Sequence, residues 1–326
     1  MRPSRLCLAL LVLVLLTLSG VGLAQAQDPV APARDDPTGM SFISSLRARS
    51  YGGGEMERVR VLAETPDFTR YLIRYPSDGL TIQGFMNVPT GVEPPYRVVV
   101  VAHGYVNPDA YPLLPYTTPY ADALASAGFL VVHPGYRNHT GSDDGPNPFR
   151  SGYTIDVLNL VALLKQQPDV RPDAIGLFGH SMGGEVTIKA LVVRPQDIHA
   201  AVLYGAMGAD AWENWNLINW KWAGGWFLFD GPFSPWRDRA AFRLASPSAF
   251  LADVAAPIQI HHGTADDTAP YEWATDLHQR LLDAGKPAEL YSYRGAGHSF
   301  WTGSAAYNAL MARSIAFFDA HLRADP

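Results

Sequence analysis

The sequence predicts an α/β protein with a mostly parallel central sheet and helices on both faces of that sheet. From residue 96 to residue 322, short apolar segments alternate with helical patterns, as in repeated strand–helix–strand units. Two of these segments, VVVVA and AIGLFG, are unbroken apolar runs, which is typical of strands covered on both faces. With 48% hydrophobic and 17% charged residues in 326, the chain can bury the large core that such a sheet needs.

The first 26 residues have the pattern of a secretory signal peptide. Arg2 and Arg5 precede the apolar run 6–18, and the segment ends in the small residues of Ala24–Ala26. The apolar run is shorter than the roughly 20 residues that span a bilayer, so cleavage is favoured over a retained anchor. We therefore expect a secreted or otherwise extracytoplasmic protein that begins at Gln27 and touches a membrane only through an uncleaved leader.

Charge and cysteine content argue against nucleic acid as a partner and against stabilisation by disulfide bonds. The formal net charge is −6, and loss of the two leader arginines takes it to −8, which disfavours nucleic acid as a partner. The one cysteine is Cys7, inside the leader. Disulfides therefore cannot stabilise the exported fold.

The elements follow in chain order. Residues 27–65 are rich in Pro, Gly and Asp and predict a linker or flexible N-terminal tail, and the main domain is predicted over 66–326. Turn residues between the strands expected at 81–89 and 96–103 suggest a hairpin there. The other predicted strands are 69–75, 129–134, 174–180, 200–205, 257–263 and 288–293, and the predicted helices lie near 120–127, 154–166, 182–193, 273–284 and 305–322.

The alternation of strands and helices stops between residues 206 and 249. This segment contains six of the eight tryptophans of the chain. We predict that it forms a cap insertion whose aromatic rings line an apolar substrate pocket. Trp220 and Trp222 are the candidate substrate-binding residues, although the tryptophans of this segment could equally serve only to hold the cap on the domain.

A short motif at 179–183 predicts a catalytic nucleophile. It reads GHSMG and matches G-x-S-x-G, a sharp strand-to-helix turn that lifts a serine hydroxyl above a sheet. The motif follows the predicted strand AIGLFG and opens the helical pattern MGGEVTIKALVV, which is the context it requires. Ser181 is therefore the predicted nucleophile.

Ser181 would need a histidine base and a carboxylate that orients this histidine, because a serine hydroxyl is a weak nucleophile near neutral pH. Asp266 and His298 each follow a predicted strand, in the order acid then histidine, at the sheet edge where parallel sheets place their sites. Asp267 is a weaker alternative to Asp266. For the developing oxyanion we predict the backbone N–H groups of Tyr105 and Met182 as donors.

Adjacent histidines raise the alternative of a metal site, which we do not expect to form. His261 and His262 precede Asp266, but neighbouring strand residues point to opposite faces and cannot easily share one ion. His180, beside the predicted nucleophile, is expected to pack or hydrogen-bond in a structural role. No metal and no cofactor are expected.

Together, these segments resemble the α/β-hydrolase fold and, within it, the catalytic domain of the prolyl oligopeptidase family of serine peptidases and their esterase relatives. The resemblance runs from about Thr69 to Leu322 and is carried by HGY, YRNHTGSDDG, GLFGHSMGGEV, HHGTADDTAP and YRGAGHSF. It implies Ser181, Asp266 and His298 as the catalytic triad, with Tyr105 as an oxyanion donor. The chain is also similar to dienelactone hydrolases, which have a cysteine at the position of Ser181.

The expected function is that of a secreted serine hydrolase that cleaves a carboxylic ester, amide or peptide bond through an acyl-enzyme. Its partner would be a small ester, amide or short peptide with an apolar acyl group. Peptidase specificity does not follow from the resemblance, because too few residues precede the first predicted strand for the propeller domain of the larger peptidases. An acyltransferase using the same triad, or a noncatalytic binding protein with this fold, remains an alternative.

Overall fold

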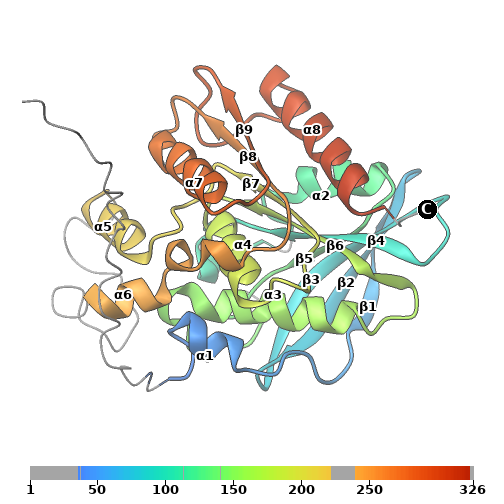
Figure 1. Ribbon diagram of the computed structural model, residues 1–326. Helices are drawn as coiled ribbons and strands as arrows, with labels where there is room; N and C mark the ends of the chain where they lie inside the picture. The colour runs from blue at the N-terminus through green and yellow to red at the C-terminus, as the bar shows by residue number, and fades with distance from the viewer. Residues whose placement is uncertain (1–35, 37, 113, 140, 222–238, 324–326) are drawn as a thin grey trace, which may run out of the picture. The chain divides into compact units, whose positions relative to one another are not determined.

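The computed structural model describes residues 36, 38–112, 114–139, 141–221 and 239–323, and in these residues one nine-stranded sheet is present (Figure 1). The order of the strands is β1-β2-β3-β5-β4-β6-β7-β8-β9. Strands β5, β4, β6, β7, β8 and β9 are parallel, whereas β1, β2 and β3 pair antiparallel along one side. The predicted α/β fold with a mostly parallel sheet is confirmed.

The strands are β1 (Glu57–Glu64), β2 (Phe68–Ser77), β3 (Leu80–Pro89), β4 (Tyr96–Ala102), β5 (Leu130–Pro134), β6 (Val170–His180), β7 (Ala200–Tyr204), β8 (Ile258–Gly263) and β9 (Ala288–Tyr293). The α-helices are α1 (Ile43–Arg47), α2 (Thr118–Ser126), α3 (Ser151–Leu164), α4 (Met182–Val193), α5 (Ala211–Lys221), α6 (Arg239–Ala245), α7 (Tyr271–Asp283) and α8 (Ala305–His321). Among the described residues, none of the helices combines the length and the apolar character needed to cross a membrane.

Strand β4 shows why the central strands are unbroken apolar runs. Val98 and Val100 belong to the core on the side of α3 and α4, whereas Val99 and Val101 belong to the core on the side of α2 and α8. All four valines are fully buried. Because successive side chains point to opposite faces of a strand, a sheet covered by helices on both faces needs apolar residues at every position.

The segment from residue 36 to residue 65, where it is described, is folded rather than a tail. Helix α1 buries Ile43 and Leu46 and contacts α4, and β1 extends the sheet beside β2. The backbone N–H of Gly52 donates to Asn159 Oδ1 of α3 at 2.8 Å. The prediction of a linker over 27–65 was therefore wrong for this part, while residues 27–35, residue 37 and the predicted signal peptide 1–26 lie outside the described residues.

The predicted hairpin is also corrected. Strand β3 pairs with β2 and β5, whereas β4 pairs with β5 and β6. The turn between β2 and β3 is Asp78-Gly79, with φ angles of 54° and 81°. A two-residue turn with positive φ at both positions favours Asp-Gly and matches the twist of an antiparallel pair, so this dipeptide determines the hairpin.

The tryptophan-rich segment 206–249 is described only at its two ends. It begins after β7 and contains α5 and α6, which contact one another. Residues 222–238, including Trp222, Trp226 and Trp236, lie outside the described residues. The predicted cap therefore stays a prediction.

Candidate active site

Ser181 occupies a strained turn between β6 and α4. Its φ is 55° and its ψ is −120°, which is an unfavourable region for a residue with a side chain. The flanking glycines are required by close backbone approaches: a Cβ on Gly179 would lie 2.4 Å from the carbonyl oxygen of Gly183, and a Cβ on Gly183 would lie 2.0 Å from that of Ala102. The glycines of the motif thus allow the turn to sit against β4.

The structure brings the three residues of the predicted triad together. His298 Nε2 lies 2.9 Å from Ser181 Oγ, and His298 Nδ1 lies 2.8 Å from Asp266 Oδ2. The three residues follow β6, β8 and β9, whose carboxyl ends meet at one edge because the strands are parallel. In the arrangement that satisfies all three groups, His298 Nδ1–H donates to the carboxylate and Nε2 accepts the serine hydroxyl proton.

Asp266 is held as a carboxylate by four donors. Its Oδ1 accepts the backbone N–H groups of Thr268 and Ala269 at 2.8 and 2.9 Å, and its Oδ2 lies 3.1 Å from His262 Nε2 and 2.8 Å from His298 Nδ1. Burial acts to raise the pKa of Asp266, but hydrogen bonds from His262 and His298 outweigh it and hold the pKa below its ordinary value. An ionised Asp266 can therefore orient His298 at neutral pH.

His262 is a part of this site that the sequence interpretation missed. It was expected to be an ordinary strand residue, but its Nε2 lies between Asp266 Oδ2 and the carbonyl oxygen of Ala269, 3.0 Å away. His261 instead contacts Tyr293 and Gln259, so the two histidines do not converge on one point. The available signal was the four-residue spacing of His262 and Asp266 across the end of β8.

His180, beside Ser181 in the chain, contacts Tyr116 and the backbone of His298. Its Nδ1 accepts a hydrogen bond from the hydroxyl of Tyr116 at 2.8 Å, and its Nε2 lies 3.4 Å from the backbone oxygen of His298. Burial, with the nearby ring of His298, lowers the pKa of His180 to about 3, so the ring is neutral at physiological pH. The expected structural role of His180 agrees with these contacts.

The loop after β4 brings Tyr105 to the nucleophile. Both Tyr105 and Met182 line the same cavity as Ser181, and their backbone N–H groups have no acceptor among the described residues. A Cβ on Gly104 would lie 2.9 Å from Ser181 Cβ and 2.1 Å from the hydroxyl oxygen of Tyr116. Glycine at this position therefore permits the close approach of the loop that an oxyanion hole requires.

A cavity of about 850 Å³ opens at Ser181. Its walls come from the loop after β4, the start of α3, α4, and α5. The lining residues are Tyr105, Tyr116, Asn147, Phe149, Arg150, Tyr153, Ser181, Met182, Glu185, Met207, Ala211, Asn214, Trp215, Ile218, Thr268, His298 and Ser299. A volume of this size accommodates a small organic substrate.

The cavity-lining tryptophan of α5 is Trp215 rather than Trp220. Trp215 is 6% exposed and lines the cavity with Ile218, one turn further along the helix, whereas Trp220 is 72% exposed and does not line the cavity. Trp222, the other predicted substrate-binding residue, lies outside the described residues. The helical face that meets the cavity is determined by packing against the domain, which the sequence pattern did not reveal.

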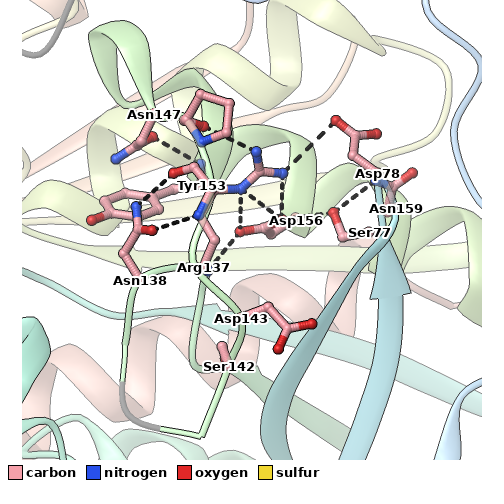
Figure 2. A network of polar contacts seen from close by, with 12 residues as sticks. Ser77, Asp78, Arg137, Asn138, Ser142, Asp143, Asn147, Tyr153, Asp156 and Asn159 are labelled. Atoms are coloured by element: carbon pink, nitrogen blue, oxygen red, sulfur yellow. Dashed lines mark hydrogen bonds and ion pairs between the residues drawn. The ribbon is translucent and has the colours of Figure 1, made fainter.

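A buried ion pair joins Arg137, in the loop after β5, to Asp156 of α3 (Figure 2). Arg137 and Asp156 of α3 are 1% and 0% exposed, and Arg137 Nη2 lies 2.8 Å from Asp156 Oδ1. The Arg137 backbone N–H also donates to Asp156, as does the hydroxyl of Ser77 on β2 at 2.6 Å. This network joins β2, the loop after β5 and α3, and therefore fixes the start of α3, from which Tyr153 reaches the cavity.

Comparisons with known proteins agree with this fold. The model of the prolyl oligopeptidase family matches residues 120–325. The uncharacterized peptidase YuxL of Bacillus subtilis (strain 168) is 27% identical over 235 residues, covering 68% of this chain and 34% of that protein. This chain thus spans about a third of the length of that relative.

Two solved structures are similar in fold. An acylaminoacyl peptidase from Pyrococcus horikoshii has a TM-score of 0.62 and 19% identity, covering 80% of this chain and 43% of that one. An acetyl xylan esterase from Paenibacillus sp. R4 has a TM-score of 0.64 and 17% identity, covering 86% of this chain and 92% of that one. At these identities the likeness shows the α/β-hydrolase fold.

Proposed function

The chain belongs to the prolyl oligopeptidase family and is a serine hydrolase, and we propose that it cleaves a carboxylic ester or amide bond through an acyl-enzyme formed on Ser181. The observation that carries this proposal is the hydrogen-bonded series Ser181–His298–Asp266, with distances of 2.9 and 2.8 Å. A serine, a histidine and a carboxylate in this order have the geometry for nucleophilic acyl transfer. The reaction needs no cofactor.

The proposed first step is attack of Ser181 Oγ on the substrate carbonyl carbon. His298 Nε2 takes the hydroxyl proton as the Oγ–C bond forms, and Asp266 stabilises the resulting imidazolium. The backbone N–H groups of Tyr105 and Met182 donate to the oxyanion of the tetrahedral intermediate. His298 then protonates the leaving alcohol or amine, and the bond to the leaving group breaks.

The second step releases the acid. Water enters, His298 Nε2 accepts one of its protons, and the oxygen attacks the acyl carbon of the Ser181 ester. Collapse of the second tetrahedral intermediate returns the proton to Ser181 Oγ and frees the carboxylic acid. Each step uses the same donors and the same base.

We propose a small ester, amide or short peptide as substrate, with an apolar acyl group. The apolar side chains of Phe149, Trp215, Ile218 and Met207 in the cavity wall support this choice.

We also propose that residues 1–26 are a signal peptide and that the mature protein is secreted. Sequencing the N-terminus of the exported protein tests this proposal, since cleavage is expected to leave Gln27 first.

Replacement of Ser181 tests the proposed function. Purified Ser181→Ala protein should lose about 10⁶-fold in kcat toward 4-nitrophenyl esters, the order of magnitude for removing a triad serine. The Ser248→Ala protein is a matched control, because Ser248 lies outside the cavity. Unchanged ester hydrolysis by the Ser181→Ala protein would contradict the proposal.

A further inference from the structure

The cavity contains a charged cluster that the acyl-enzyme mechanism does not use. Arg150 and Glu185 line the cavity, and Lys189 lies one helical turn beyond Glu185 on α4. Arg150 Nη1 forms an ion pair with Glu185 Oε2, and Lys189 Nζ lies 3.9 Å from Glu185 Oε1. Two cationic side chains therefore share one carboxylate.

The net positive charge of this cluster lies on Arg150, whose side chain faces the cavity. The side chain of Lys189 is 1% exposed and donates to the carbonyl oxygen of Phe149, whereas the side chain of Arg150 is 25% exposed. Burial lowers the pKa of Lys189 to about 8, so it is still mostly protonated at neutral pH. Glu185 is thus already opposed by a buried ammonium group, and Arg150 contributes a positive charge that is not neutralised within the cluster.

Arg150 also retains donors. Within the described residues, its side chain has one acceptor, Glu185, although a guanidinium carries five N–H donors in a planar fork. The backbone at Phe149 and Arg150 is left-handed, with φ angles of 50° and 56°, which is uncommon for two successive residues with side chains. Lys189, through the carbonyl of Phe149, helps to hold this conformation. Such strain is concentrated at functional sites.

The cluster lies at a suitable distance from the nucleophile. Glu185 follows Ser181 by four residues at the start of α4, which is roughly one turn, or about 6 Å along the helix. Met182 and Tyr153 line the same cavity. A substrate whose carbonyl carbon is at Ser181 can therefore extend along α4 to Arg150.

We propose that Arg150 binds an anionic group of the substrate, a carboxylate several bonds away from the scissile carbonyl. This proposal rests on the proposed function of Ser181. A carboxylate matches the planar guanidinium fork and can accept two parallel hydrogen bonds from it. The preferred substrates are then half-esters of dicarboxylic acids, or esters and amides whose leaving group carries the carboxylate.

Three esters test this proposal on the purified full chain. 4-Nitrophenyl hemiglutarate carries a carboxylate on the acyl side, 4-carboxyphenyl pentanoate carries it on the leaving side, and 4-nitrophenyl pentanoate carries none. In the Arg150→Gln protein, kcat/KM for one of the two anionic esters should fall about 10- to 100-fold more than kcat/KM for the neutral ester, mainly through KM. The ester that responds identifies the side of the scissile bond that faces Arg150.

Two further variants separate binding from a purely structural role. The Arg150→Lys protein should recover part of the preference, because it keeps the charge. The Arg150→Gln/Glu185→Gln protein should show the same loss as Arg150→Gln, because both variants lack the guanidinium that faces the cavity and the double variant also removes its structural partner Glu185. Arg194→Gln, at the far end of α4 in an ion pair with Asp197 at 2.7 Å, is the control and should not change the preference.

Equal losses for the anionic and neutral esters in the Arg150→Gln protein would overturn the proposal and leave Arg150 as a structural partner of Glu185. If the wild-type protein cleaves none of the three esters, the result counts against the proposed function instead. In that case, calorimetric binding of monoethyl glutarate to the Ser181→Ala protein still tests Arg150. Adding Arg150→Gln should weaken this binding at least about tenfold, and equal binding would again overturn the proposal.

Discussion

Asp266 and Asp156 are both carboxylates with fully covered side chains, yet their surroundings shift their pKa values in opposite directions. Burial raises the pKa of Asp156 above its ordinary value even though the guanidinium of Arg137 lies beside it. Burial acts on Asp266 in the same direction, but hydrogen bonds from His262 and His298 lower its pKa. Each carboxylate accepts hydrogen bonds from several donors, so the presence of donors alone does not determine whether its pKa is raised or lowered.

The two sites differ in depth and in what they connect. Asp156 lies inside the fold, where Arg137 and Ser77 tie α3 to β2. Asp266 lies in the loop after β8, beside a cavity that opens to the nucleophile. One buried acid therefore supports the architecture of the domain while the other supports the proposed chemistry, and substitution can separate the two roles.

The largest expected effect is on activity, at Asp266. In the Asp266→Asn protein, kcat should fall by about 10⁴-fold, because the amide favours the wrong tautomer of His298. Ester hydrolysis measured under saturating substrate checks this. Asp267→Asn is the matched control, since Asp267 is exposed in the same loop. A loss of similar size in the Asp267→Asn protein would mean that the acid has been misassigned.

The next largest effect is on stability, at Asp156. The Asp156→Asn protein should lose about 3–5 kcal/mol of unfolding free energy, because the amide puts an NH2 donor where a carboxylate oxygen accepts from Arg137, so buried guanidinium donors lose their acceptor. Urea denaturation measures this loss, and kcat per folded molecule should stay near that of the wild type. Loss of kcat in folded Asp156→Asn protein would contradict a purely structural role for Asp156.

A paired replacement by apolar residues sharpens this result. In the Arg137→Met/Asp156→Leu protein both charges are removed, so most of the lost stability should return. If the double variant is no more stable than Asp156→Asn, the desolvated charge of Arg137 is not the cause of the loss.

The smallest expected effect is a difference in pH dependence between the two aspartates. The folded-state pKa of Asp266 is lowered, so its contribution to stability is present above pH 4 and is lost as the pH falls further. The folded-state pKa of Asp156 is raised, so its linked contribution is present below about pH 4 and is lost as the pH rises. Each unit of pKa difference corresponds to about 1.4 kcal/mol.

Denaturation of both Asn variants between pH 3 and pH 6 measures this difference. The stability of wild type relative to Asp266→Asn should decrease on acidification, whereas that relative to Asp156→Asn should increase. Buried histidines that contact neither aspartate, such as His133, whose pKa is lowered to about 3 by burial, destabilise all three proteins equally in acid and cancel in the comparison. Parallel slopes for the two variants would contradict the opposite pKa shifts.

The sequence predicted which residues meet at the candidate site because its signals are local. Ser181, Asp266 and His298 each follow an apolar strand directly, and the parallel order of β6, β8 and β9 brings the strand ends together. The sharp turn at Ser181 was likewise visible in its flanking glycines. The positions of these residues at the ends of predicted parallel strands were therefore enough to predict that their side chains meet.

Features that depend on long-range packing were not predicted. Strand β1 is mostly exposed and its burial does not alternate, and the charged–apolar alternation of its sequence covers only RVRV at 58–61. Helix α1 has five residues, too few for a helical period. The partner of Asp156 is separated from it by 19 residues, with no pattern in the sequence that links the two. Similarly, the choice of Trp215 over Trp220 depends on which side of α5 packs against the domain.

The most direct test of the central claim is covalent labelling of the wild-type protein by a fluorophosphonate, followed by peptide mapping. Activation of Ser181 by His298 and Asp266 predicts one adduct, on the peptide that contains Ser181, formed in step with the loss of ester hydrolysis. Denatured protein should not be labelled. An adduct on another residue, or full activity in protein labelled at Ser181, would contradict the account.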